Sequence, residues 1–414
     1  MNLKTKKVLC YDIGLFTEQC ARLAKDFGQV WYFTPWADLF PHSNKALIGH
    51  DFDGLERILD FWDYVEKADM IFIPDTHCGD IVEFLKRKGF LVAGVGRAEI
   101  LELDRWKARQ IQKELKLPYQ PTQKVVGLQA LRKLLMTEKN KFVKLNVFRG
   151  TLETIKHIDY ESSKPLLDHL AYELGPKQDT MTFIVEDEIK GLEPGIDSIV
   201  FDGENLSPCV LGYEKKGAGY IGSVIPYNQF PKQLKQISDK FGLVFKTLKT
   251  RFFYSAEAIV PDRTHGYLID LTCRMAAPAV SAIQTELIEN FSQVIYGLAT
   301  GQKVQPIMKY KYVAGVALES DWVDTHWTKI SFPPSLRQWI KLRVACKFGK
   351  DYYAIPGLAS LCTVIALGNS IDEVVDLCKQ RCEQVNVYQI VKNLTGLDEI
   401  VEDIKAGRKL GITF

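Results

Sequence analysis

The sequence predicts a multidomain protein that combines α/β and α+β units. Its 414 residues are too many for one ordinary core, because domains of soluble proteins run to about 150 residues. The first hundred residues alternate strand and helix patterns, which is typical of a doubly wound parallel sheet. From Tyr119 on, shorter strands with hairpin turns are typical of an α+β region. We expect units over residues 1–118, 119–187, 188–312 and 313–414.

The composition is that of an ordinary globular protein. Hydrophobic residues make up 46% and charged residues 25%, and the net charge of +2 gives no basic surface for nucleic acid. The apolar run after the basic start is broken by Asp12, and no stretch approaches the roughly 18 apolar residues of a membrane span. We therefore expect a cytoplasmic protein with neither a nucleic-acid nor a membrane partner.

The nine cysteines suggest neither disulfides nor a zinc site. Their number is odd and no two of them form a Cys-x-x-Cys pair, so we expect reduced thiols. Cys378 and Cys382 lie four positions apart on a predicted helix and could face one another. We interpret them as half-buried small apolar side chains.

The N-terminal elements follow from apolar periodicity. Strands are predicted over residues 7–13, 29–33, 68–74 and 90–95, and helices over residues 17–27, 80–88 and 98–116. Gly28 ends the first helix, and Pro118 forbids continuation of the last. The Gly94-Val95-Gly96 segment lacks the third glycine of the dinucleotide fingerprint, which disfavours a Rossmann cofactor site.

The rest of the chain mixes strands and helices. Strands are predicted over residues 141–145, 154–158, 181–185, 195–201, 252–260, 267–271, 313–318 and 361–367, and helices over residues 233–242 and 284–297. A further helix begins at Ser370, because Glu373 three positions later completes a capping box. We expect residues 313–414 to form a separate, smaller unit.

Two segments carry groups suited to a nucleotide, although no glycine-rich phosphate loop with its lysine is present. Lys144 lies within a predicted strand, and its ammonium group faces either solvent or an anion. Several carboxylates follow an apolar strand, which suits ribose hydroxyls and the edge of a base. A solvated acidic turn is the alternative. These carboxylates are Glu186, Asp187, Glu188 and Glu193.

A third segment has the composition of a metal site. Asp270, Thr272 and Arg274 share one face of a predicted strand, with Glu257 opposite on the paired strand. Facing carboxylates repel unless a cation lies between them, and Mg²⁺ takes one or two carboxylates together with phosphate oxygens. An ion pair between Asp270 and Arg274 is the alternative.

The order and spacing of these segments resemble the ATP-grasp superfamily, and most closely its glycinamide ribonucleotide synthetase family, over most of the chain. The resemblance rests on Asp104-Arg105-Trp-Lys-Ala-Arg109 before Pro118, on Phe142-Val-Lys144, on residues 185–193, and on Asp270-Leu-Thr272-Cys-Arg274. It implies an N-terminal pre-ATP-grasp α/β domain, a two-lobed ATP-grasp domain and a small C-terminal α/β domain.

The resemblance also implies roles for single residues. Arg109, in place of a lysine, and Lys144 would contact ATP phosphates, and Glu193 would contact the ribose. Adenine contacts would lie near Glu186, Asp187, Glu188 and Ile189. Mg²⁺ or Mn²⁺ would be held by Glu257, Asp270 and Thr272.

The sequence departs from the family at several places. Thr272 stands where the family has a metal-binding asparagine, and only one glycine, Gly150, follows Lys144 where the family has several. Residues 11–16, Tyr-Asp-Ile-Gly-Leu-Phe, replace the glycine-rich loop that holds the ribose phosphate of the amine. Residues 217–223 are related to the family's glycine-site segment but differ from it.

We therefore expect an ATP-dependent carboxylate–amine ligase that acts on small-molecule substrates. ATP would phosphorylate a carboxylate, and an amine would then displace phosphate from the acylphosphate to form an amide. Lys144 and Arg274 would act in catalysis, with Arg274 on the carboxylate or acylphosphate. Two alternatives stay open: true phosphoribosylamine–glycine ligase activity, and a nucleotide-binding protein that has lost turnover.

Overall fold

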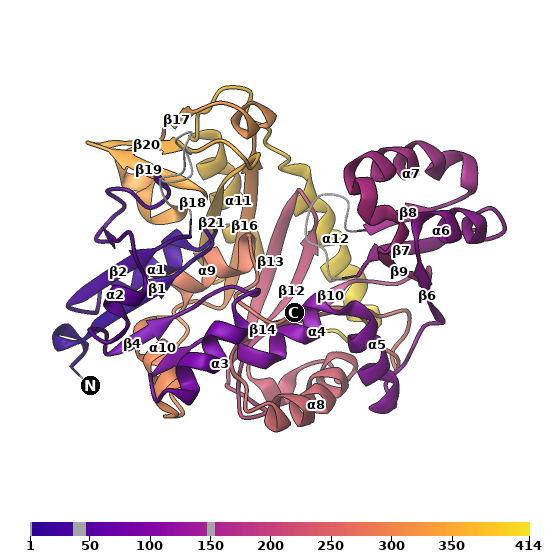
Figure 1. The fold of residues 1–414 in the computed structure, drawn as a ribbon, viewed down its shortest axis with the longest axis horizontal. Coiled ribbons are helices and arrows are strands. Elements are labelled where there is room, and N and C mark those ends of the chain that lie inside the picture. Colours follow the sequence, from indigo (N-terminus) through magenta and orange to yellow (C-terminus); the bar gives the residue numbers. More distant parts are fainter. Residues whose placement is uncertain (1, 36–46, 147–153) are drawn as a thin grey trace.

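The computed structural model describes residues 2–35, 47–146 and 154–414 (Figure 1). These residues form a five-stranded parallel sheet, a four-stranded sheet, a nine-stranded sheet and a three-stranded sheet. In Figure 1 the nine-stranded sheet runs through the middle of the molecule, between the parallel sheet on the left and the four-stranded sheet on the right. Within the described ranges, no helix is long and apolar enough to cross a membrane.

The N-terminal sheet is parallel, as the alternation of strands and helices predicts, with the order β3-β2-β1-β4-β5. Val8 and Cys10 of β1 face the main core, whereas Leu9 faces a second apolar cluster that includes residues of α2 and α3. Both faces of the sheet are therefore covered, as parallel sheets require. The elements are β1 (Lys7–Tyr11), α1 (Thr17–Leu23), β2 (Gln29–Phe33), β3 (Glu56–Arg57), α2 (Trp62–Val65), β4 (Met70–Phe72), α3 (Gly79–Arg87) and β5 (Val92–Ala93).

The prediction of a single helix over residues 98–116 is wrong, because the helix is interrupted at Asp104. A 3-10 turn (Gly96–Glu99) and α4 (Ile100–Leu103) precede α5 (Arg105–Glu114). Between them Asp104 has φ −109° and ψ 86°, and its carboxylate accepts a hydrogen bond from the backbone N–H of Lys107. Aspartate is a strong N-cap residue, so a second helix begins after Asp104, whereas the apolar pattern alone suggests one continuous helix.

A small lobe follows, with a sheet in the order β6-β9-β7-β8. Its strands are β6 (Thr122–Val126), β7 (Lys141–Leu145), β8 (Thr154–His157) and β9 (Thr182–Asp187), and its helices are α6 (Leu128–Leu135) and α7 (Tyr160–Leu174). Leu131, Leu167 and Phe183 belong to an apolar cluster of its own. The small lobe therefore has its own core, and Figure 1 shows it standing apart on the right.

The nine-stranded sheet has the order β15-β14-β10-β12-β13-β16-β21-β18, with β11 paired to β10. Its strands are β10 (Pro194–Phe201), β11 (Glu204–Asn205), β12 (Cys209–Lys215), β13 (Gly219–Ile225), β14 (Arg251–Ile259), β15 (Tyr267–Thr272), β16 (Tyr312–Glu319), β18 (Ile340–Leu342) and β21 (Ser360–Gly368). The helix α8 (Lys232–Thr247) contacts β10 and β14. The helix predicted over residues 284–297 is wrong as one element: α9 (Ala279–Leu287) and α10 (Phe291–Thr300) are separated by extended backbone at Ile288.

The C-terminal segment does not form a separate unit, contrary to our expectation, because it adds strands to this same sheet. β16 pairs with β13 on one side and with β21 on the other, so the sheet continues across residue 313. The three-stranded sheet of β17 (Thr328–Ile330), β19 (Ala345–Phe348) and β20 (Asp351–Ala354) lies beyond it. Ser370 caps α11 (Ile371–Glu383), as predicted, and α12 (Thr395–Lys409) follows.

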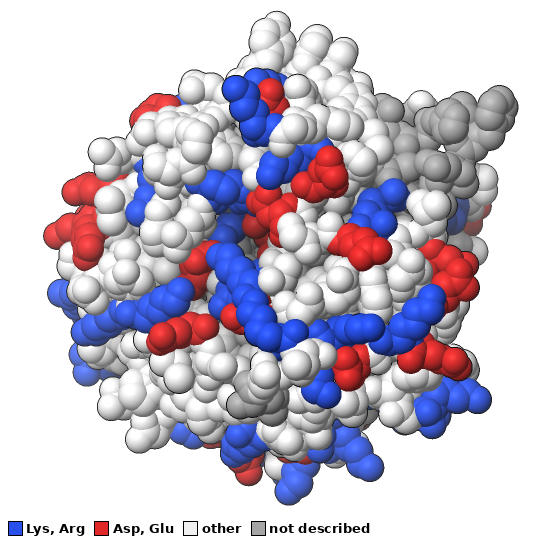
Figure 2. Space-filling model, turned by 90° about the vertical axis from the view of Figure 1, so that its left-hand side faces the viewer, with Lys and Arg blue, Asp and Glu red and all other residues white. Residues whose placement is uncertain are grey.

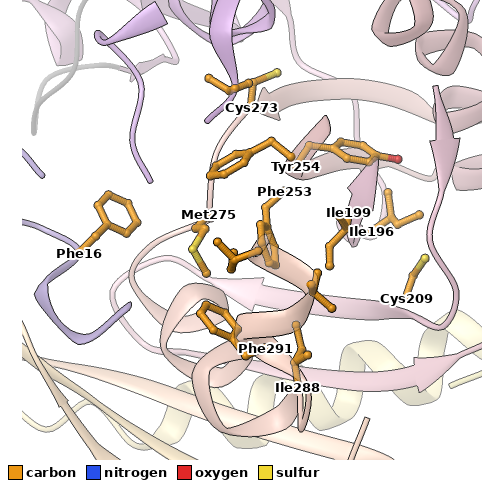
Figure 3. Packing of buried hydrophobic residues seen from close by; sticks show 14 of the residues in the cluster. Phe16, Ile196, Ile199, Cys209, Phe253, Tyr254, Cys273, Met275, Ile288 and Phe291 are labelled. Carbon is orange, nitrogen blue, oxygen red and sulfur yellow. The ribbon is translucent and has the colours of Figure 1, made fainter. Parts of the chain in front are cut away.

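One apolar core joins the N-terminal unit to the nine-stranded sheet. Figure 3 shows Phe16, which precedes α1, in the same cluster as Phe253 of β14, Met275 and Phe291 of α10. All four side chains are at most 1% exposed. The N-terminal unit is therefore fixed against the large sheet.

The nine cysteines are also buried and none forms a disulfide, which agrees with the reduced thiols expected.

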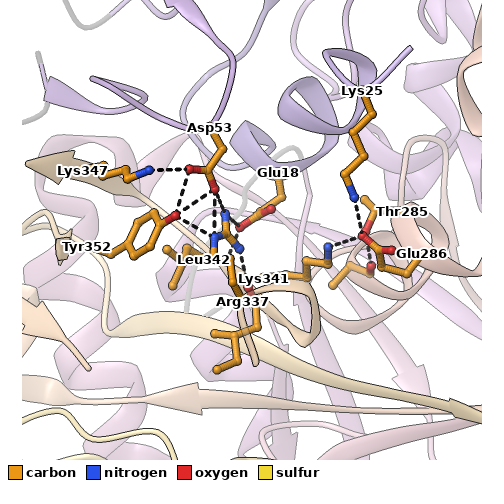
Figure 4. Close-up of polar contacts among 12 residues, drawn as sticks. Glu18, Lys25, Asp53, Thr285, Glu286, Arg337, Lys341, Leu342, Lys347 and Tyr352 are labelled. Carbon is orange, nitrogen blue, oxygen red and sulfur yellow. Dashed lines mark hydrogen bonds and ion pairs between the residues drawn. The ribbon is translucent and has the colours of Figure 1, made fainter. Parts of the chain in front are cut away.

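A polar network joins the N-terminal unit to the C-terminal segment (Figure 4). Asp53 accepts hydrogen bonds from Arg337, Lys347 and the Tyr352 hydroxyl, and Arg337 also forms an ion pair with Glu18 of α1 at 2.8 Å. These contacts cross from residues near the start of the chain to residues near its end. The two parts are therefore connected by half-buried ion pairs as well as by the core.

Charges of both signs are interspersed on the face that Figure 2 shows. Lys and Arg side chains lie beside Asp and Glu side chains there, and uncharged residues cover the rest of the face. A face of this kind gives no single-sign field that would attract a polyelectrolyte.

Candidate functional site

Lys144 and Glu186 lie on neighbouring strands of the small lobe, on one face of the sheet. Strands β7 and β9 are antiparallel, with Lys144 opposite Ile184 and Phe142 opposite Glu186, so the two charged side chains are diagonal neighbours. Lys144 Nζ lies 3.7 Å from Glu186 Oε2, and the side chains are 4% and 2% exposed. Lys144 is therefore not a solvated lysine, and its charge is directed at buried anions.

Arg109 of α5 completes this buried cluster. Its guanidinium donates hydrogen bonds to both carboxylate oxygens of Glu186 and to the backbone carbonyl of Ile269 in β15. Burial alone would raise the pKa of Glu186, but the charges of Arg109 and Lys144 overcome it and hold that pKa below its usual value. Arg109 thus links the small lobe to the large sheet.

Asp270 on β15 lies close to the same cations. Lys144 Nζ donates to Asp270 Oδ2 at 3.0 Å, and Arg105 Nε lies 3.8 Å from Asp270 Oδ1. Burial would raise the pKa of Asp270, but the charges of Lys144, Arg109 and Arg105 outweigh it and lower the pKa to about 2. Three cations from α5 and β7 therefore meet one carboxylate at the edge of the large sheet.

The predicted pairing of Glu257 with Asp270 is confirmed. The two residues are partners in the β14–β15 register, and Ser255 is opposite Thr272. The Glu257 side chain has no hydrogen bond or ion pair to any residue that the structure describes. Burial and the nearby carboxylates raise its pKa to about 7, against the opposing charge of Lys216. A half-buried carboxylate without a partner favours a bound cation.

Arg274 lies just past the end of β15 and does not pair with Asp270. Its Nε is 2.9 Å from Glu102 Oε1 of α4 and 3.4 Å from Asp75 Oδ1. The backbone N–H of Cys273 donates to the other oxygen of Glu102 at 2.8 Å. The alternative of an Asp270–Arg274 ion pair is thereby excluded, and Glu102 fixes both the guanidinium and the backbone that carries it.

Most of these groups, but not Lys144 or Glu186, line a cavity of about 570 Å³ between the lobes and the N-terminal unit. Its charged lining residues include Glu102, Arg105, Arg109, Glu214, Lys216, Glu257, Asp270, Arg274 and Arg343, and Thr272 also lines it. A smaller cavity of about 250 Å³ shares Glu214, Lys215, Lys216 and Glu257 with the first. The structure therefore brings Glu257, Asp270, Thr272 and Arg274 to one polar cavity, whereas Lys144 lies behind Asp270 and is not among the lining residues.

The residues predicted to contact adenine and ribose lie elsewhere. Asp187 and Glu188 form ion pairs with Lys141 and Lys156 of the small lobe, and neither lines the larger cavity. Ile189 is half-buried beside them, and Glu193 is exposed and lines the smaller cavity. Glu186 is occupied by Arg109 and Lys144. The nucleoside contacts accordingly stay predictions.

Some residues of the site were not predicted from the sequence. Arg105 lies within the Asp104–Arg109 motif, but the motif assigns it no role. The sequence signal of Glu214 and Lys216 is a charged run before the Gly217-Ala-Gly219 stretch. Glu102 and Arg343 carry no sequence signal, because only the tertiary fold brings them to the cavity. The segment containing Gly150 lies outside the described residues.

The donor set fits Mg²⁺ or Mn²⁺ only with help from a substrate. Among the described residues no group of three or more His, Cys, Asp or Glu side chains could hold a metal ion alone. Glu257 and Asp270 form a pair of carboxylates beside the Thr272 hydroxyl, and Mg²⁺ commonly takes one or two carboxylates and completes its shell with phosphate and water. The pair therefore suits a metal that arrives with a nucleotide.

No protein-family model and no curated protein matches this sequence. Solved structures do match over nearly the whole chain. A phosphoribosylamine–glycine ligase from Thermotoga maritima is 14% identical, with a TM-score of 0.70 over 94% of this chain and 99% of that one. The biotin carboxylase domain of 2-oxoglutarate carboxylase from Hydrogenobacter thermophilus, in complex with MgADP and bicarbonate, is 14% identical, with a TM-score of 0.68 over 99% and 96%.

An L-amino acid ligase from Bacillus licheniformis is 13% identical, with a TM-score of 0.62 over 93% of this chain and 98% of that one. At these identities the likeness concerns the fold. It shows that the chain has the ATP-grasp fold, with the mixed α/β architecture predicted from the sequence.

Proposed function

We propose that this protein is an ATP-dependent carboxylate–amine ligase, which forms an amide through an acylphosphate and releases ADP and phosphate. The observation that carries the proposal is the gathering of Arg105, Arg109 and Lys144 around Asp270 at the edge of the polar cavity. Lys144 and Arg105 approach the Asp270 carboxylate itself, and Arg109 donates to the carbonyl of the preceding residue, Ile269. Arg109 and Lys144 are buried and Arg105 is half-buried, and three such cations beside a pair of carboxylates suit a triphosphate with its metal. The ligases with the same fold support this class.

Each group has a role in the proposed reaction. Lys144 and Arg109 would hold the phosphates, and Glu257 and Asp270, with Thr272, would hold Mg²⁺ or Mn²⁺. When bound, the metal would offset charge on the transferred phosphoryl group. Glu186, Asp187, Glu188 and Ile189 are proposed to lie near adenine, and Glu193 near the ribose.

Arg274 would orient the carboxylate, because it is the cation of the cavity held in place by Glu102. A carboxylate oxygen attacks the γ-phosphorus, and ADP leaves. The amine nitrogen then attacks the carbonyl carbon of the acylphosphate, phosphate leaves, and the nitrogen loses a proton to water. The side chains act by positioning and by charge, so no covalent enzyme intermediate is needed.

The N-terminal loop disfavours phosphoribosylamine as the amine. The Asp12 carboxylate accepts hydrogen bonds from the backbone N–H groups of Leu15 and Phe16, and Phe16 is fully buried. These N–H donors, which could otherwise bind a phosphate, are occupied by a side chain of the protein itself. We therefore favour an amine other than phosphoribosylamine.

The test is ADP release from Mg-ATP in the presence of pools of carboxylic acids and amines. We expect amine-dependent release by the wild type and a large loss in Lys144→Ala. Lys133→Ala is the matched control, because Lys133 belongs to α6 of the same lobe but is exposed and lines neither cavity. Wild-type turnover in Lys144→Ala would contradict the assignment, and Mg-ATP binding without ADP from any pool would favour a nucleotide-binding protein that has lost turnover.

A further inference from the structure

The smaller cavity opens beside the proposed reaction centre. It is walled by residues of β10, β12 and β14, and it shares Glu214 and Glu257 with the larger cavity. Since Glu257 is assigned to the metal, a molecule in the smaller cavity would lie next to the transferred phosphoryl group. Its volume of about 250 Å³ suits a small organic molecule.

The lining of this cavity has more acidic than basic side chains. Glu193, Asp197 and Glu214 line it in addition to Glu257, and the cations are Lys215 and Lys216. Lys215 is already paired, at 2.7 Å, with Asp403 of α12. Within the described part of the chain, Glu193 and Glu214 form no hydrogen bond or ion pair through their side chains. Lys216 alone cannot balance three carboxylates.

Asp197 is the buried end of the cavity, and its charge has no cationic partner in the described chain. It is 6% exposed and accepts hydrogen bonds from the hydroxyls of Ser255 and Tyr220, both of which are neutral. A Cβ at Gly212 would overlap the Tyr220 ring, so this glycine makes room for the tyrosine that orients the carboxylate. A buried carboxylate with only neutral donors favours a cationic ligand.

We propose that this cavity binds the amine substrate and selects amines that carry a second, cationic group. The inference rests on the ligase function proposed above. The second ammonium group would lie between Asp197 and Glu214, and the reacting nitrogen, uncharged when it attacks, would point toward Glu257 and the larger cavity. Amines bearing phosphate or carboxylate would be repelled by the same carboxylates.

Three amines of equal chain length test the proposal. 1,3-Diaminopropane carries a second ammonium group, 3-aminopropan-1-ol carries a neutral hydroxyl, and β-alanine carries a carboxylate. We expect kcat/KM for amine-dependent ADP release to fall in that order, by roughly tenfold or more between the first two. Calorimetric titration of the full chain with each amine, in the presence of Mg-ADP, gives the same ranking without turnover.

Two variants connect the preference to the cavity. Asp197→Asn keeps the shape and removes the charge, and we expect it to lose the preference for 1,3-diaminopropane over 3-aminopropan-1-ol. Glu214→Gln gives a second test on a half-buried side chain whose replacement breaks no contact in the described structure, should the buried variant fail to fold. Asp12→Asn is the control, since Asp12 is also buried and held by a tyrosine hydroxyl but lines neither cavity.

The outcomes separate this inference from the proposed function. ADP release with β-alanine or 3-aminopropan-1-ol at least as efficient as 1,3-diaminopropane would overturn the inference and leave the ligase standing. If no amine supports ADP release, the ligase proposal fails, and calorimetry alone decides whether the cavity binds dications. Equal affinity for all three amines would overturn the inference about the cavity. A preference for 1,3-diaminopropane that persists in both Asp197→Asn and Glu214→Gln would overturn it as well.

Discussion

The ion pair between Glu286 and Lys341 should contribute measurably to stability, and Glu286→Gln tests this. Glu286 Oε1 accepts hydrogen bonds from Lys341 at 2.8 Å and from Lys25 at 3.2 Å (Figure 4). Gln338 donates to the other carboxylate oxygen at 3.0 Å. The Glu286 and Lys341 side chains are only 3% and 7% exposed. The substitution keeps the shape of the side chain and leaves the Lys341 ammonium group buried beside a neutral amide.

The magnitude follows from the pKa of Glu286. Burial would raise it, but Lys341 and Lys25 outweigh burial and lower it from 4.5 to about 2. A shift of this size corresponds to about 3 kcal/mol of stability at neutral pH. Burial lowers the pKa of Lys341 in spite of its acidic neighbours, so the pair is worth less than the Glu286 shift alone. We expect Glu286→Gln to lose roughly 2 to 3 kcal/mol.

Chemical denaturation of the two proteins at several pH values gives the test. Because the folded-state pKa is depressed, the stabilisation is present above pH 4.5 and is lost as the pH falls toward 2. The difference in the free energy of unfolding between wild type and Glu286→Gln should therefore shrink by roughly 1 kcal/mol as the pH is lowered from 7 to 4. Adding Lys341→Met should recover part of the loss. If Glu286→Gln lowers the free energy of unfolding by less than about 0.5 kcal/mol, and by the same amount at pH 7 and pH 4, the ion pair does not stabilise the fold as argued.

Three further predictions concern the site and its support. Asp270→Asn removes a proposed metal ligand and the partner of Lys144, so the rate of ADP release should fall roughly 100-fold. Titration with Mg²⁺ should show that the variant needs a higher Mg²⁺ concentration for half-maximal activity. An unchanged half-maximal Mg²⁺ concentration would exclude Asp270 as a ligand. Glu102→Gln should raise the KM of the carboxylate roughly threefold to tenfold and leave that of ATP unchanged, because Glu102 holds Arg274; equal effects on both would point to a general structural role. Burial raises the pKa of Asp12 to about 6, so this group makes the free energy of unfolding of the wild type fall as the pH rises from 4 to 6. Glu257, whose pKa is also raised, remains in Asp12→Asn, so the fall measured by denaturation should be smaller in that variant than in the wild type. An equal fall in both proteins would contradict the prediction.

Elements with strong local signals were predictable from the sequence. The strands of the parallel sheet are continuous apolar runs, since both faces are buried, and β2 and β7 have the bounds predicted. The pairing of Glu257 with Asp270 followed from two strands around a short turn. Period and turn chemistry are local properties, so the residues concerned are visible in one stretch of sequence.

Features that depend on distant contacts were not predictable. The apolar pattern of residues 98–116 continues through Asp104, and only the cap geometry shows the break. The membership of β16 and β21 in the large sheet depends on pairing with β13, almost a hundred residues earlier. Glu102 meets Arg274 across 172 positions of sequence, and no local pattern indicates such a contact.

The central claim is that the cations around Asp270 bind a nucleotide triphosphate with its metal. Calorimetric titration of the full chain with Mg-ATP measures this directly, whatever the acid and amine substrates are. We predict saturable binding to the wild type, weakened roughly tenfold or more in Lys144→Ala and unchanged in Lys133→Ala. Absence of Mg-ATP binding to the folded wild-type protein, or equal affinity in all three proteins, would contradict the account.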